Sequence, residues 1–99
     1  MTEEREKPMF EYELNSQELL KRRVRYLIQT DYNGVADFLE HLHDRKVDEK
    51  EVKTFNLFLN RGKINFEFLV ALSQKTKIGE VPLRRLLNIE FNNEDLFKS

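Results

Sequence analysis

The sequence predicts an all-α fold, a compact bundle of about five short helices in a single domain. Its 99 residues suit one domain with a modest core. Only three glycines and two prolines interrupt the chain, and its apolar residues recur with the 3.6-residue period of a helix rather than alternating as in a strand. With 39% hydrophobic and 35% charged residues, the composition is that of a soluble globular protein.

The first two helices are predicted from capping residues and apolar spacing. Asn15 and Glu18 have the spacing of an N-cap and its capping-box partner, so the first helix is expected over residues 16–29. Asp31 is the expected N-cap of the second helix. The apolar positions at helical spacing are Leu20, Val24, Leu27 and Ile28 in the first helix, and Val35, Ala36, Leu39 and Leu42 in the second.

The third helix is predicted from Glu49 to about Arg61, because Asp48 and Glu51 repeat the capping-box spacing. Its buried stripe is expected to contain Val52, Phe55, Phe58 and Leu59. Gly62 follows the last periodic residue, so we expect it to end the helix in a left-handed conformation.

Two further helices complete the prediction. Asn65 is the expected N-cap of a helix that carries Phe66, Leu69, Val70 and Leu72. Pro82 is expected to open a last short helix with Leu83, Leu86 and Leu87. The predicted core of the domain contains Val24, Leu27, Val35, Ala36, Leu39, Phe55, Leu59, Leu69 and Leu72.

Charge is distributed unevenly along the chain. Residues 1–13 have a net charge of −3 and residues 89–99 have −2, while the whole chain has only −1. The helical body therefore has a net positive charge. Since neither end shows helical periodicity, we expect an acidic N-terminal tail over residues 1–13, a helical domain over 14–88 and a C-terminal tail over 89–99.

Secretion and membrane insertion are not expected. The chain has no cysteine for a disulfide framework, its N-terminus is charged, and no apolar run approaches the ~20 residues that span a bilayer. A cytoplasmic location fits these properties best.

Catalysis is also not expected, and neither is a cofactor. Gly34, Gly62 and Gly79 are isolated, whereas nucleophile elbows and phosphate-binding loops need glycines at fixed spacing. The one group with metal-ligand spacing is too small for a carboxylate-bridged site, because the chain has only two histidines, and we interpret it as a solvated helix face without a metal. This group contains Asp37, Glu40, His41, His43 and Asp44.

The order of the helices over about residues 16–79 resembles the lambda-repressor-like helix-turn-helix family of Cro and repressor proteins. In that family the second helix carries an apolar-alanine pair and an apolar residue three positions later, as do Val35, Ala36 and Leu39. The third helix ends in an apolar residue and a glycine near basic residues, and a capped apolar helix follows. The matching residues are Leu59, Arg61, Gly62 and Lys63, and then Asn65 through Leu72.

The resemblance implies a sequence-specific DNA-binding transcriptional regulator that binds double-stranded DNA as a homodimer, with residues 14–88 as the helix-turn-helix domain. The helix of residues 49–61 would then be the recognition helix. Its expected base-contacting residues are Lys50, Lys53, Thr54, Leu57 and Asn60, and the expected phosphate contacts are Lys21, Arg22, Arg25, Arg61 and Lys63. Glu49 and Glu51 oppose this reading, since acids near the start of a recognition helix repel phosphate.

A second interpretation is a protein-interaction module on the same fold, either antitoxin-like or an accessory subunit, without DNA binding. The connection over residues 43–47 is longer than the tight turn typical of the family, which would change the angle of the third helix. The sequence pI of about 6.1, the acidic ends and the apolar residues Leu57, Phe91 and Phe97 favour a protein partner, which the tails could contact.

Overall fold

The computed structural model describes residues 16–61 and 64–97, which contain helices and connections and no strand. The predicted all-α fold class is confirmed. The expectations for residues 1–15 and for Gly62 and Lys63 lie outside the described residues. The helices are α1 (Ser16–Asp31), α2 (Val35–His43), α3 (Glu49–Arg61), α4 (Phe66–Lys75), the 3₁₀ helix η1 (Lys77–Glu80), α5 (Leu83–Leu86) and α6 (Asn93–Leu96).

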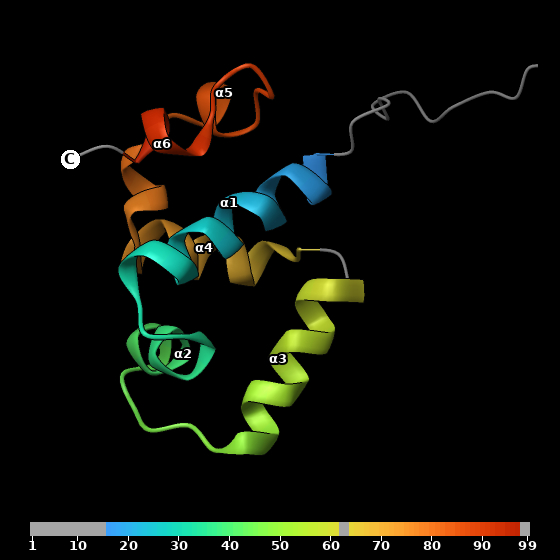
Figure 1. Cartoon of the computed structure of the whole chain (residues 1–99), viewed down its shortest axis with the longest axis vertical. Coiled ribbons are helices and arrows are strands. Elements are labelled where there is room, and N and C mark those ends of the chain that lie inside the picture. The colour runs from blue at the N-terminus through green and yellow to red at the C-terminus, as the bar shows by residue number, and fades with distance from the viewer. Residues whose placement is uncertain (1–15, 62–63, 98–99) are drawn as a thin grey trace, which may run out of the picture.

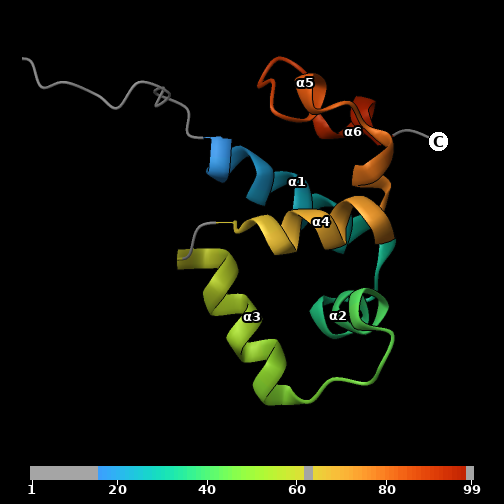
Figure 2. The same ribbon diagram turned by 180° about the vertical axis from the view of Figure 1, so that it is seen from behind.

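The helices are arranged around a middle layer formed by α1 and α4 (Figures 1 and 2). In both views α2 and α3 lie on one side of this layer, and α5 and α6 lie on the other. One apolar core connects the two sides, because it takes side chains from almost every helix. Its buried members are Leu20, Val24, Leu27, Ile28, Phe38, Leu39, Leu42, Phe55, Leu59, Ile64, Leu72, Ile78, Leu86 and Phe97.

The start of α2 differs from the prediction. Helix α1 continues through Asp31, whose carboxylate lies 3.2 Å from the Lys77 ammonium instead of capping α2. The N-cap position is occupied by Gly34, whose φ of 98° lies in a region that L residues rarely adopt. The predicted Asp31 cap is therefore wrong, because the turn into α2 needs a glycine backbone.

The inner face of α2 is also shifted relative to the predicted one. Phe38, Leu39 and Leu42 are buried, whereas Ala36 is exposed and Val35 is only half-buried. Val35, Phe38, Leu39 and Leu42 have the i, i+3, i+4, i+7 spacing of one helix face, and Ala36 lies about 100° away from Val35. The prediction that Ala36 belongs to the core is wrong, and Phe38 takes its place.

The connection between α2 and α3 begins with the C-cap of α2 at Asp44 and ends with the N-terminal capping box of α3. Asp44 adopts the left-handed conformation with φ 57°, and its N–H donates to the Glu40 carbonyl. At the other end, the Asp48 N–H donates to the Glu51 carboxylate at 3.1 Å, and the Glu51 N–H donates to the Asp48 carboxylate at 2.9 Å. The predicted capping box of α3 is confirmed, as are the bounds of this helix.

The start of α4 follows the prediction, and the chain after it adds a helix that was not expected. The Asn65 side chain caps α4 by accepting from the Phe68 N–H at 2.8 Å. Thr76 ends α4, and its hydroxyl accepts from the Ile78 N–H at the start of η1. Ile78 is buried, so η1 contributes to the core despite its length of four residues.

Residues 89–97 belong to the folded body and are not a tail. Asn92 caps α6 by accepting from the Asp95 N–H at 2.8 Å, and Phe97 is buried beside Tyr26 of α1. Arg23 of α1 is 2% exposed and donates to four acceptors within residues 86–93. Its acceptors are the carbonyls of Leu86, Asn88 and Phe91 and the Asn93 side chain, at 2.8 to 2.9 Å.

Candidate nucleic-acid interface

Helix α3 presents a polar outer face because its inner face is anchored by aromatic packing. Phe55 is buried, with its ring centroid 5.8 Å from that of Phe38 in α2 and 5.7 Å from that of Phe68 in α4. Leu59 is buried one turn later. The 100° step of the helix then turns the opposite face away from the core. The five predicted base-contacting residues are all exposed, namely Lys50, Lys53, Thr54, Leu57 and Asn60.

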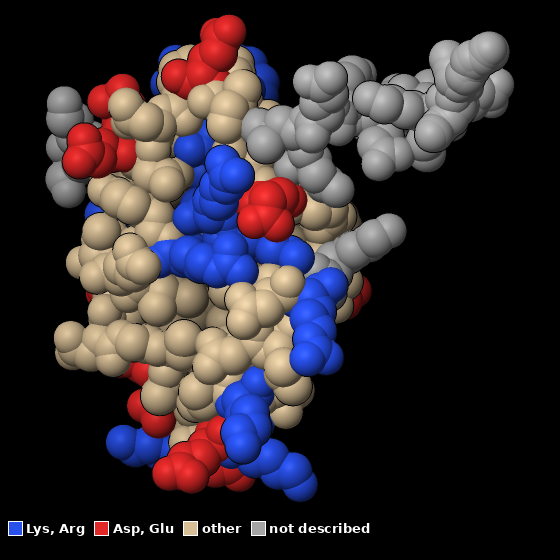
Figure 3. Space-filling view, turned by 45° about the vertical axis from the view of Figure 1, so that its right-hand side comes forward, with Lys and Arg blue, Asp and Glu red and all other residues tan. Residues whose placement is uncertain are grey.

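A basic surface extends from this helix onto α1. We define it by the exposed Lys50, Lys53 and Arg61 of α3 together with Arg22 and the half-exposed Arg25 of α1. Lys and Arg atoms gather in a band across the middle of the face in Figure 3 and continue toward its lower edge. A surface of this kind attracts the phosphate backbone of a nucleic acid.

The contact between α1 and α3 is made by Arg25. Its guanidinium donates to the Asn60 side-chain oxygen at 2.9 Å and lies 3.5 Å from the Leu59 carbonyl, near the end of α3. A third neighbour is Glu18, whose carboxylate lies 3.8 Å away. Arg25 therefore connects α1 to α3 as well as contributing charge, and among the described residues the Asn60 NH₂ group has no acceptor.

The other predicted phosphate contacts differ in how exposed their side chains are. Arg22 and Arg61 are exposed, whereas Lys21 is only 7% exposed. Lys63 lies outside the described residues. The structure therefore brings Arg22, Arg25 and Arg61 to the basic surface and leaves Lys21 largely covered.

Glu51, one of the two acids at the start of α3, is paired with Arg45, which is not among the predicted site residues. Arg45 donates to both carboxylate oxygens of Glu51, at 3.2 and 2.5 Å. The hydrogen bond from Arg45 is the main cause that lowers the pKa of Glu51 to about 2, and the Asp48 N–H contributes as well. Glu51 is thus ionised at neutral pH with its charge balanced by Arg45, which weakens its expected repulsion of phosphate.

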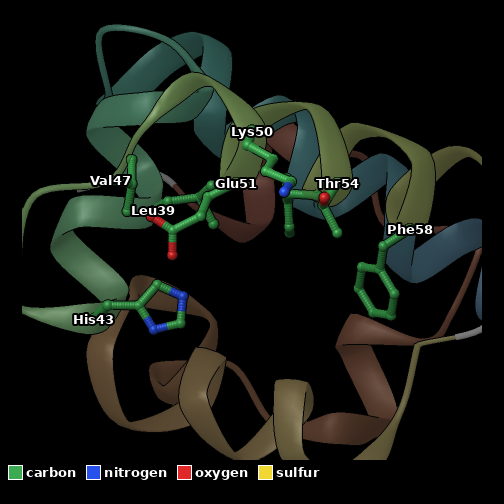
Figure 4. Close-up of a pocket in the computed structure, with 8 residues that line it drawn as sticks. Leu39, His43, Val47, Lys50, Glu51, Thr54 and Phe58 are labelled. Atoms are coloured by element: carbon green, nitrogen blue, oxygen red, sulfur yellow. The ribbon is translucent and has the colours of Figure 1, made fainter.

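A cavity of about 450 Å³ lies between α2 and α3. Its apolar lining comes from Leu39, Val47, Phe55 and Phe58, and Figure 4 shows Val47 and Phe58 on opposite sides of it. The polar lining residues are His43, Lys50, Glu51 and Thr54. Lys50 and Thr54 therefore belong both to this cavity and to the predicted DNA-contacting set.

The residues with metal-ligand spacing on α2 take part in contacts between segments instead. The His41 Nε2–H donates to the Lys75 carbonyl at 2.6 Å, and Asp44 lies 3.1 Å from the Lys75 ammonium. The Glu40 carboxylate accepts from the Val47 N–H at 3.3 Å. Within residues 16–61 and 64–97, no three His, Asp or Glu side chains are grouped so that they could hold a metal ion.

Comparison with protein-family models, with curated proteins and with solved structures finds no match to this chain. Among the helices of the described part, none has the length and apolar character that a membrane span requires.

Proposed function

We propose that this protein is a sequence-specific DNA-binding transcriptional regulator with a helix-turn-helix formed by α2 and α3. The observation that supports this most is the exposed outer face of α3. It carries hydrogen-bond donors and apolar groups, and it is part of the basic surface that continues onto α1. A helix of this kind can enter the major groove while flanking cations contact phosphates.

Each residue of the outer face has a definite chemistry for this role. Lys50 and Lys53 can donate to the O6 and N7 acceptors of guanine, and the NH₂ group of Asn60 can donate to adenine N7. Thr54 and Leu57 carry methyl groups that can contact the methyl group of thymine. Arg22 and Arg61 would bind phosphates, which adds affinity without sequence preference.

The regulator is proposed to act as a homodimer. One domain of this kind reads few base pairs, whereas two copies read half-sites about 34 Å apart along the duplex. The operator would then have the two-fold symmetry of the dimer.

Selection of bound sequences from a random duplex library, followed by titration of the selected duplex over a salt series, tests this proposal. Lys53→Ala is expected to change which bases are preferred, because it removes a groove donor. Arg61→Ala is expected to weaken binding to all duplexes alike and to reduce the salt exponent by about one. Arg84→Ala is the matched control, since it removes an exposed cation from α5, on the far side of the α1–α4 layer.

If an electrophoretic mobility-shift assay at low salt shows no complex with any duplex, while circular dichroism shows that the protein is folded, the proposal is contradicted. The same conclusion would follow if all three variants weakened binding equally without changing base preference or the salt exponent.

The cavity between α2 and α3 favours a second candidate, a protein-interaction module on the same fold, antitoxin-like or an accessory subunit. Its apolar lining, together with the 47% exposed Leu57 of α3, could receive apolar side chains of a protein partner. Thr54→Arg would fill the cavity with a bulky cation. This variant should lose a protein partner while retaining phosphate-driven binding to DNA.

A further inference from the structure

A second apolar groove lies at the start of α1, away from α2. It has a volume of about 260 Å³, and its floor contains Leu20, Ile64 and Leu69. Phe66 and Leu87 also line it, and they are 73% and 39% exposed. Leu20 and Ile64 are themselves buried, so the groove is an opening onto the edge of the core.

The exposure of Phe66 is high for a large aromatic residue. Phe66 is the first residue of α4, directly after the Asn65 cap, and its ring contacts little of the described chain. Covering an exposed aromatic side chain removes apolar surface from water, which is favourable. The groove therefore favours an apolar occupant.

Ser16, the first residue of α1, lines this groove, so the segment that precedes α1 joins the helix beside it. Phe10, Tyr12 and Leu14 alternate with Glu11 and Glu13 just before it. In extended backbone this alternation places the three apolar side chains on one side and the two acids on the other. Phe10 is six residues from Ser16 in the sequence, and six residues of extended chain span about 20 Å, so this segment is long enough to reach across the groove.

We propose that residues 10–14 dock onto this groove in extended form, with Phe10, Tyr12 and Leu14 against Phe66 and Leu87 and the two acids facing solvent. The short tether makes the docking intramolecular, with an effective concentration in the millimolar range. A free segment in another molecule does not reach that concentration in dilute solution, which favours the chain's own segment over a second copy.

The absence of tryptophan from the sequence makes a direct test possible. Tyr12→Trp places a single tryptophan on the apolar side of the segment, and Glu11→Trp places one on the acidic side as the matched control. We expect the Tyr12→Trp emission to be blue-shifted, with an acrylamide quenching constant several-fold below that of the control.

A second substitution locates the docking site. Adding Phe66→Ser to Tyr12→Trp should raise its quenching constant to that of the Glu11→Trp control. Since Phe66 is 73% exposed, the domain should stay folded, which far-UV circular dichroism checks. Leu87→Ser provides the same test at a second lining residue of the groove.

Three outcomes would overturn the proposal. Equal quenching of Tyr12→Trp and Glu11→Trp would show that the segment does not dock with one face. If the tryptophan of Tyr12→Trp stays protected from acrylamide when Phe66→Ser or Leu87→Ser is added, the segment docks at another site. Protection that disappears on dilution would identify a second copy as the occupant.

Discussion

Replacing Arg23 is expected to destabilise the packing of residues 86–93 against α1. Arg23 is buried and uses four N–H groups on four acceptors between residues 86 and 93. Within the described part of the chain, no carboxylate forms an ion pair with it. Burial lowers the pKa of Arg23, but the guanidinium stays charged at neutral pH. Its contribution to stability therefore comes from these hydrogen bonds.

The magnitude follows from the acceptors that Arg23→Met would leave behind. The bond to the Leu86 carbonyl is buried, so that oxygen would lose its partner at a cost of about 1 to 3 kcal/mol. The other three bonds are only partly buried, and water would replace the donor at about 0.5 to 1.5 kcal/mol each. We expect a total loss of about 2.5 to 7.5 kcal/mol, a large share of the stability of a small domain.

Urea denaturation followed by far-UV circular dichroism measures this loss as a change in the free energy of unfolding. Arg22→Met is the matched control, because Arg22 is exposed and its loss should cost less than about 0.5 kcal/mol. Arg23→Lys should recover little, since one ammonium group cannot span acceptors arranged around a planar guanidinium. A loss below about 1 kcal/mol for Arg23→Met would refute the reasoning.

Three further predictions concern stability. The pKa of Glu51 is about 2 in the folded state against 4.5 for the free group, so its pairing with Arg45 stabilises the fold above pH 4.5 and is lost as the pH falls toward 2. Glu51→Gln should therefore flatten the acid decline of the unfolding free energy over that range, and an unchanged profile would contradict the pairing. Phe55→Ala should cost about 3 to 5 kcal/mol in urea denaturation, and a loss under 1 kcal/mol would show that its site is not a packed core. Gly79→Ala would place its Cβ against the Ser73 carbonyl of α4, so the melting temperature should fall further than for Gly34→Ala. The added Cβ of Gly34→Ala meets no other atom, and its cost is only the strained φ, about 1 to 3 kcal/mol.

Local signals predicted much of the fold. The capping boxes and N-caps act over three residues, so Asp48 with Glu51 and Asn65 could be identified directly. Helix α3 is long enough for its apolar period to define one face, and its bounds were predicted correctly. In the nine-residue α2, several apolar residues offer competing faces, and Phe38 was missed for that reason.

Other features depend on contacts between distant segments. Helices η1 and α6 have four residues each, which is too short for a period to appear. Arg23 lies next to the buried stripe of α1, but its acceptors are 63 to 70 residues away along the chain. At the candidate interface, the exposed face of α3 follows from its buried face, whereas the bond between Arg25 and Asn60 depends on how two helices meet.

The separation between Arg23 and its acceptors also bears on how the protein folds during synthesis. Chains emerge from the ribosome starting at the N-terminus, so α1 is exposed long before residues 86–93 are made. Until then the guanidinium remains hydrated, and Leu86 and Phe97 are not yet there to cover the adjoining apolar side chains of α1. The core of the nascent domain thus stays incomplete until its last two helices appear, and a translational pause before residue 93 would extend the time during which this core is accessible to chaperones and proteases.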